Sequence, residues 1–127
     1  MVFRVLTRAG VTSKITRKNL EKFVKRYATD GKTLDVGCAG GPYAEYFPNR
    51  VGIDVNLSPA VDIVADVHDL HMFEADEFDA VLCTEVLEHL HTPHQGIAEM
   101  RRVLKPDGML VLTTRFVYPL HDVPGDY

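Results

Sequence analysis

The chain has 127 residues, of which 46% are hydrophobic and 25% charged, and its formal net charge is −4. This composition is ordinary for a soluble globular domain, and the sequence holds no internal repeat and no low-complexity tract. Two cysteines make no disulfide framework, and no apolar run reaches the ~18 residues of a membrane span. We therefore expect one domain over residues 1–127, in the cytoplasm and without membrane contact.

The charge is divided unevenly along the chain. Residues 1–32 carry nine Lys or Arg against two Asp or Glu, a net charge of +7, whereas the rest of the chain has a net charge of −11. A basic segment on an acidic body could contact nucleic acid or an anionic substrate. Because no aromatic residues interleave to stack on bases, we prefer a solvated basic helix region, and nucleic acid is a disfavoured but not excluded partner.

The basic segment holds the first predicted element. Apolar residues recur there at helical spacing, which predicts an amphipathic helix over about residues 15–29 with a basic outer face. These residues are Leu20, Phe23, Val24 and Tyr27.

Five short apolar runs follow, with the near-continuous hydrophobicity of parallel strands that are covered on both faces. They are residues 33–37, 50–54, 61–65, 79–84 and 109–115. Before the last run, Thr92, Pro93 and Gln95 supply an N-cap, a first-turn proline and a capping-box residue for a helix that ends in a turn at residues 105–108. Strands that alternate with helices predict a doubly wound α/β sheet.

One connection is short for parallel strands. Only residues 55–60 separate the second and third runs, whereas such strands normally need a dozen or more connecting residues. Either the crossover is a bare loop, or the third run is a short, irregular edge strand. We expect the sheet to be weakest at that edge.

The first strand runs into a glycine-rich turn at residues 37–42 (GCAGGP), of the kind that cradles nucleotides. A P-loop needs Lys and Ser or Thr after its glycines, and here Pro42 and Tyr43 follow. A dinucleotide fingerprint needs G-x-G-x-x-G, but Ala39 and Pro42 occupy two of the three glycine positions. Asp35 would also face a diphosphate, and like charges repel.

The same carboxylate suits a ligand with a positive charge. S-adenosylmethionine carries an ammonium and a sulfonium and no phosphate, so Asp35 could balance a cation while the following helix N-terminus takes the ligand's carboxylate. Residues 34–41 (LDVGCAGG) resemble the first motif of class I S-adenosylmethionine-dependent methyltransferases, and more narrowly their small-molecule branch called type 11. Ala39 stands where that family often has glycine.

The resemblance continues in order over roughly residues 16–127. Residues 51–54 (VGID) resemble the segment whose acidic residue binds the ribose hydroxyls, which gives that role to Asp54. Residues 65–67 (ADV) resemble the adenine-side segment, where Asp66 would accept from the exocyclic amine. The other matching segments are residues 78–89 and 100–108.

The resemblance implies a Rossmann-like, mostly parallel sheet with the strand order 3-2-1-4-5. It also implies a cofactor site for S-adenosyl-L-methionine at the ends of those strands. The predicted members of this site are Asp35, Gly37, Cys38, Ala39, Gly40, Asp54, Val55, Asp66, Val67 and Cys83.

No catalytic residue is assigned, because a general base is needed only when the acceptor is a poorly ionised hydroxyl, amine or carbon acid. The candidates near the expected mouth of the site are Glu85, His89, His91, His121 and Asp122. We expect no metal, since the spacing His89-x-His91-x-x-His94 crosses from a turn into a helix.

The chain departs from the family pattern at its end. A complete class I domain has two more strands after the fifth, so we expect a truncated domain that lacks them, with residues 116–127 as a substrate-side tail. The run at 109–115 would then be an exposed edge. We expect the tail to cover this edge, or a second copy of the chain to cover it in a homodimer.

Two functions from different classes remain open. The first is an S-adenosylmethionine-dependent methyltransferase that acts on a small-molecule acceptor, which the sequence does not name. The alternative is a non-catalytic cofactor-binding or partner-binding module that kept the fold but lost its acceptor site.

Overall fold

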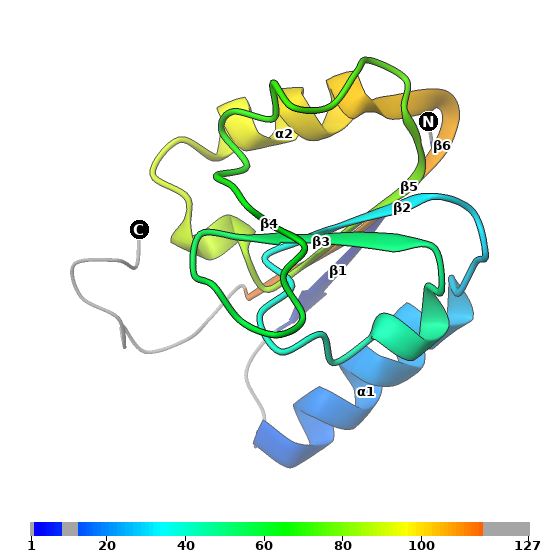
Figure 1. The fold of residues 1–127 in the computed structure, drawn as a ribbon. Helices are drawn as coiled ribbons and strands as arrows, with labels where there is room; N and C mark the ends of the chain where they lie inside the picture. Colours follow the sequence, from blue (N-terminus) through cyan, green and yellow to red (C-terminus); the bar gives the residue numbers. More distant parts are fainter. Residues whose placement is uncertain (1, 9–12, 116–127) are drawn as a thin grey trace.

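The computed structural model describes residues 2–8 and 13–115, which form a β-sheet with helices on both faces (Figure 1). The strands are β1 (Val2–Arg8), β2 (Thr33–Val36), β3 (Arg50–Asp54), β4 (Ile63–Val64), β5 (Phe78–Thr84) and β6 (Leu104–Arg115). The helices are α1 (Ser13–Arg26), α2 (Pro93–Val103) and two 3-10 helices, η1 (Ala44–Tyr46) and η2 (Leu87–His89). This is the predicted doubly wound α/β class.

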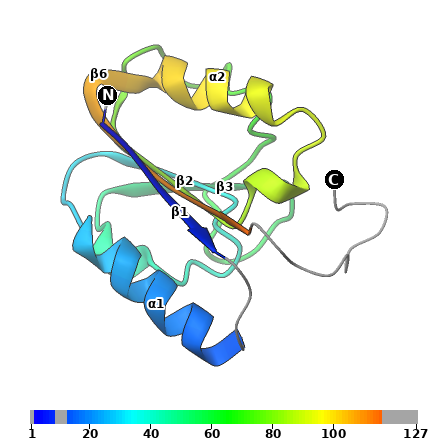
Figure 2. The ribbon, with the colours of Figure 1, turned by 180° about the vertical axis from the view of Figure 1, so that it is seen from behind.

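The sheet has the order β1-β6-β5-β2-β3-β4, and every neighbouring pair is parallel. Strands β2 to β6 correspond to the five predicted runs, so the predicted order 3-2-1-4-5 is confirmed. An additional strand, β1, lies along the edge next to β6 (Figure 2). It pairs from Val2 opposite Met109 to Arg8 opposite Arg115.

The expectation of an exposed edge at residues 109–115 is therefore wrong. A strand edge carries unpaired N–H and C=O groups, and β1 pairs with those of β6. The basis for a homodimer through that edge is removed with it. The tail of residues 116–127, the other expected cover, lies outside the described residues.

Alternate residues of the strands supply two separate cores. Leu34 and Val36 of β2 belong to a buried cluster beneath α2. Leu82 and Val111 belong to a second cluster on the opposite face, together with Leu20 of α1. Because side chains alternate along a strand, the residue between Leu34 and Val36 faces the α1 layer.

The two predicted α-helices are confirmed, with shifted ends. The helix expected over 15–29 is α1, which ends at Arg26. In α2, Thr92 is the N-cap residue and Pro93 the first helical residue. The Thr92 hydroxyl donates to Oε1 of Gln95 at 2.8 Å and makes no cap to a backbone N–H. None of the helices among the described residues has the length and apolar character to cross a bilayer.

The expected turn at residues 105–108 is a bulge inside β6. Phe78 of β5 pairs with Leu104 of β6, and Ala80 of β5 pairs with Met109 of β6. The residues of β6 between Leu104 and Met109 therefore loop out of the ladder. The bulge lies at the amino ends of the neighbouring strands, away from the glycine turn.

Two connections near the glycine turn are short. The crossover from β3 to β4 is a loop without a helix, and β4 is a short edge strand of only two residues, so both alternatives expected for this edge are found.

The expectation of a helix directly after the glycine turn is wrong. Only η1 forms there, because Pro48 and the start of β3 follow at once. Too few peptide dipoles align in a three-residue helix to make the N-terminal anion site that was expected for a ligand's carboxylate.

Candidate functional site

The carboxyl ends of β2, β3 and β5 surround a cavity of about 390 Å³. Parallel strands bring their carboxyl ends to one edge of a sheet, where ligands of such folds bind. Half of the predicted cofactor residues line it: Gly37, Asp54, Val55, Asp66 and Val67. Further lining residues, which are not among the predicted members of the site, include Asn56, Ala65, His68, Val86 and Leu90.

The glycine turn meets the loop after β5 at this cavity. Gly37 has a φ of +64° and Ala39 a φ of +44°, both left-handed conformations. A Cβ at Gly37 would lie 2.3 Å from Cγ2 of Val86, so only glycine lets the two loops touch. At Gly40 a Cβ would meet nothing within 4 Å. The turn therefore presents backbone with open space beside it.

Two backbone N–H groups hold the carboxylate of Asp54 at the end of β3. The N–H of Ala39 donates to Oδ2 at 3.0 Å, and that of Asn56 donates to Oδ1 at 2.9 Å. Because a carboxylate offers about four acceptor sites, each oxygen keeps one further site. This geometry suits a bidentate contact with two adjacent hydroxyl groups.

Asp66 follows β4 and is paired with His68. Nδ1 of His68 lies 2.5 Å from Oδ1 of Asp66, and the N–H of His68 donates to the same oxygen at 2.9 Å. The backbone hydrogen bond from His68 is the main cause that lowers the pKa of Asp66. An ionised Asp66 keeps Oδ2 to accept from an amine. Nε2 of His68 is buried and has no hydrogen-bond partner among the described residues.

Asp35 lies below the turn and does not line the cavity. It is 3% exposed, and Oδ2 accepts from Nε of Arg50 at 3.2 Å. Burial raises the pKa of Asp35 to about 6, against the lowering effect of Arg50. The guanidinium supplies the positive charge that the sequence analysis assigned to the ligand. The structure therefore favours a buried ion pair over direct contact between Asp35 and a cationic ligand.

Cys38 and Cys83 both have buried side chains. Sγ of Cys38 lies 3.6 Å from the carbonyl oxygen of Ala60. Cys83 is fully buried in the cluster beneath α2, where burial raises its pKa to about 12. Neither residue lines the cavity, so the structure does not place these two predicted site residues at it.

Glu85 lines the cavity just beyond β5 in a strained conformation, with a φ of +56°. Its Oε1 accepts from Oγ1 of Thr113 at 3.0 Å, and Oε2 accepts from Nε of Arg115 at 2.6 Å. A left-handed conformation in a non-glycine residue costs energy and tends to occur at functional sites. Glu85 is therefore well fixed at the wall of the cavity.

Glu88 is a second carboxyl group in this region. Its Oε2 accepts from Oγ1 of Thr114 at 3.0 Å, while Oε1 is buried without a hydrogen-bond partner among the described residues. Burial raises the pKa of Glu88. Glu88 is not found from the sequence, because only the pairing of β5 with β6 brings it beside Thr114.

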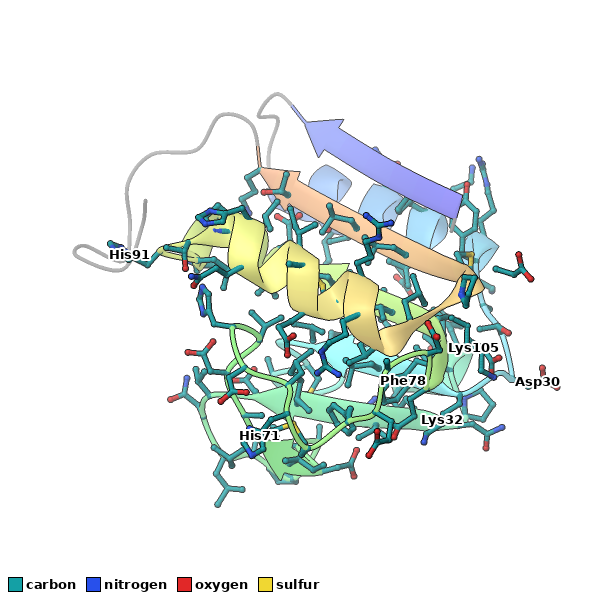
Figure 3. All side chains as sticks on the ribbon, turned by 90° about the horizontal axis from the view of Figure 1, so that it is seen from above. Asp30, Lys32, His71, Phe78, His91 and Lys105 are labelled. Atoms are coloured by element: carbon teal, nitrogen blue, oxygen red, sulfur yellow. The ribbon has the colours of Figure 1, made fainter. Side chains whose placement is uncertain are left out.

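The remaining base candidates differ in position. His89 lines the cavity. His91 lies further out, beyond the carboxyl ends of the strands, whereas Lys32 and Lys105 mark the opposite end of the sheet (Figure 3). His121 and Asp122 fall outside the described residues. Within residues 2–8 and 13–115, no three His, Cys, Asp or Glu side chains gather in a metal-binding arrangement.

The cavity residues fit an adenosyl ligand. Asp54 and Asp66 offer acceptors for hydroxyl and amine groups, and Gly37 brings the backbone of the turn to the cavity. Val55 is 62% exposed at the cavity and presents an apolar surface for a flat base. The volume lies within the ~300–1,000 Å³ of small-molecule sites.

Comparison with known proteins identifies the family of this chain. Residues 34–112 match the family model of a methyltransferase domain, type 11. The ubiquinone biosynthesis O-methyltransferase of Neisseria meningitidis is 35% identical over 103 residues, which cover 65% of this chain and 43% of that enzyme. The chain therefore spans less than half the length of this curated relative.

Solved structures share the fold. A protein of Pyrococcus horikoshii superposes with a TM-score of 0.63 at 27% identity, over 78% of this chain and 58% of its own. The cyclase SpnF superposes with a TM-score of 0.62 at 27% identity, over 81% of this chain and 47% of its own.

Proposed function

The chain belongs to the class I S-adenosylmethionine-dependent methyltransferases, within the type 11 methyltransferase domain family, and we propose that it transfers a methyl group from S-adenosylmethionine to a small molecule. The cavity at the carboxyl ends of β2, β3 and β5 is the proposed cofactor site. The observation that carries the proposal is Asp54, whose carboxylate ends β3 beside the glycine turn with a free acceptor site on each oxygen.

When bound, the cofactor supplies a methyl group on a positively charged sulfur, which is already activated for displacement. The chain's own task is to bind, to orient and to exclude water. Asp54 would hold the ribose hydroxyls, and Asp66 would accept from the exocyclic amine of the base. Val55 and Leu90 would cover the base with apolar surface, and the glycine turn would offer its backbone to the rest of the ligand.

We further propose that the acceptor group is a hydroxyl. The support is the name of the curated relatives, which are O-methyltransferases. A hydroxyl must lose its proton as the new O–C bond forms. Glu85 and His89 both line the cavity beyond β5 and are the candidates that we assign to take this proton.

The test is the release of S-adenosylhomocysteine from S-adenosylmethionine in the presence of small hydroxyl, amine and carbon-acid acceptors. Release that depends on a hydroxyl compound supports the proposal. Release with amines alone would keep methyl transfer and refute the hydroxyl acceptor.

A non-catalytic cofactor-binding or partner-binding module is the second candidate. The observation in its favour is the likeness to the cyclase SpnF, since a shared fold does not fix the reaction. A chain that binds S-adenosylhomocysteine but releases none with any acceptor would support this alternative.

A further inference from the structure

Arg50, the first residue of β3, has its guanidinium at the centre of a cluster beneath the glycine turn. Nε donates to Oδ2 of Asp35 at 3.2 Å, and Nη2 donates to the carbonyl oxygen of Ala60 at 2.8 Å. Nη1 lies 3.6 Å from Oδ2 of Asp62, which also accepts the N–H of Gly52 at 2.7 Å. The side chain of Arg50 is only 12% exposed. One buried side chain thus joins β2, β3 and the crossover loop of residues 55–62.

Two glycines keep the space around this guanidinium open. A Cβ at Gly52 would lie 2.5 Å from Nη2 of Arg50 and 2.8 Å from the carbonyl oxygen of Ala60. A Cβ at Gly41, in the glycine turn, would lie 3.0 Å from Cβ of Ala60 and 3.5 Å from Nη2. Arg50 therefore lies where the turn and the crossover loop meet.

These two segments form adjoining walls of the cavity. The turn contributes Gly37, and the crossover loop begins with Val55 and Asn56, which line the same cavity. The loop has no helix to pack it against the sheet, so other contacts must fix its position. One is the hydroxyl of Ser58, which donates to the carbonyl oxygen of Ala39 at 2.6 Å. Another is the guanidinium of Arg50, which is largely buried and donates to the carbonyl oxygen of Ala60.

We propose that Arg50 is a positioning residue for the cofactor: its guanidinium fixes the crossover loop against the glycine turn, so that both walls contact the same bound ligand. This inference rests on the proposed function. Arg50 does not line the cavity and acts through residues that do.

The position requires the shape of arginine as well as its charge. A guanidinium carries five donors in a planar fork and can bond a carboxylate and a carbonyl group at once, whereas a lysine ammonium is a single point. Burial raises the pKa of Asp35, and Arg50 lowers it. The nearby carboxylates of Asp54 and Asp62 also raise the pKa of Asp35.

The decisive variant is Arg50→Lys, which keeps the charge and loses the fork. Calorimetric titration with S-adenosylhomocysteine should show a dissociation constant raised about tenfold or more, because a charge-assisted contact of the loop is lost. Hydrogen exchange in the peptide of residues 55–62 should rise in the same variant. Loss of affinity together with loosening of that peptide is a signature that general destabilisation does not produce.

Arg102→Lys is the matched control. Arg102 makes the same kind of fork, to Glu99 and to the carbonyl oxygens of Leu70 and Phe73, none of which lines the cavity. This variant should unfold at a lower temperature and keep its dissociation constant within about twofold of wild type. An unchanged dissociation constant in Arg50→Lys would overturn the proposal, and so would equal losses of affinity in both variants.

A double variant separates anchoring from simple charge compensation. In the single variant Arg50→Lys, the buried carboxylate of Asp35 loses its guanidinium partner, which destabilises the fold. Adding Asp35→Asn removes that unpaired carboxylate. The double variant should fold and still bind weakly, because the contact with Ala60 is absent. Recovery of wild-type affinity would overturn the proposal, since Arg50 would then only neutralise Asp35. A wild-type chain that binds no S-adenosylhomocysteine would instead refute the proposed function.

Discussion

The N–H of Ala39, in the glycine turn, donates to Oδ2 of Asp54, at the end of the neighbouring strand, across 3.0 Å. This hydrogen bond joins the glycine turn, which can offer backbone groups to a ligand, with the carboxylate of Asp54, which can offer acceptor oxygens. It also orients the carboxylate before any ligand arrives, which reduces the cost of binding. The proposed cofactor site is thus built from two strand ends that hold each other in place.

Asp54→Ala should weaken the binding of S-adenosylhomocysteine about 100-fold. Two hydrogen bonds to a charged group are lost, at about 1.5 kcal/mol each. Asp107→Ala is the control, because it makes the same change in net charge at the opposite end of the sheet. Calorimetric titration measures both variants. Equal affinities for Asp54→Ala and wild type would refute the ribose assignment.

Gly37→Ala should destabilise the fold by about 3 kcal/mol, since an L-residue is strained at a φ of +64° and its Cβ would overlap Val86. Gly40→Ala, where a Cβ meets nothing, should change stability little. Urea unfolding compares the two. Adding Val86→Ala to Gly37→Ala should recover part of the loss, because it removes the overlap and leaves the backbone strain. Equal stabilities of the two single variants would contradict the close approach of Gly37 to Val86.

Ala39→Gly should stabilise the protein by about 1 kcal/mol. Ala39 is exposed and has a φ of +44°, so glycine relieves strain without loss of packing. The same change at Ala44, in η1, should destabilise, because Ala44 has no positive φ to relieve. Opposite signs in chemical denaturation are expected. Destabilisation by Ala39→Gly would show that its left-handed conformation carries no strain.

Asp35→Asn should remove a pH dependence of stability. Burial raises the pKa of Asp35 from 3.8 to about 6, so its contribution is fully present below about pH 4 and is lost as the pH rises through about 6. A shift of about two units corresponds to about 3 kcal/mol. The free energy of unfolding of the variant, relative to wild type, should therefore rise by up to that amount between pH 4 and pH 7. A difference that stays constant with pH would contradict the raised pKa.

The strands and the outline of the site follow from local sequence. Runs of apolar residues predict β2 to β6, and a carboxylate at the end of a buried run, as at Asp54, must lie at the carboxyl edge of the sheet. The strand order itself came from the family resemblance. Local patterns suffice here because each of these features depends on residues close together in the chain.

Features that depend on contacts between distant segments were missed. The partner of Asp35 is 15 residues away, and only the register of β2 on β3, with Thr33 opposite Arg50, brings the two together. The pairing of β1 with β6 joins the two ends of the described chain. No periodicity of residues 2–8 reveals that partner, so the sequence places this segment only in a basic region.

Calorimetric titration of the unmodified chain with S-adenosylmethionine, S-adenosylhomocysteine and NAD tests most directly whether the cavity is an adenosyl-cofactor site. Saturable binding of the first two at one site per chain, with no heat from NAD, is the expected result. Asp54 and the glycine turn, whose Ala39 and Pro42 depart from the dinucleotide pattern, would then be in use. Absence of binding by both S-adenosyl compounds, or tighter binding of NAD, would contradict the proposal.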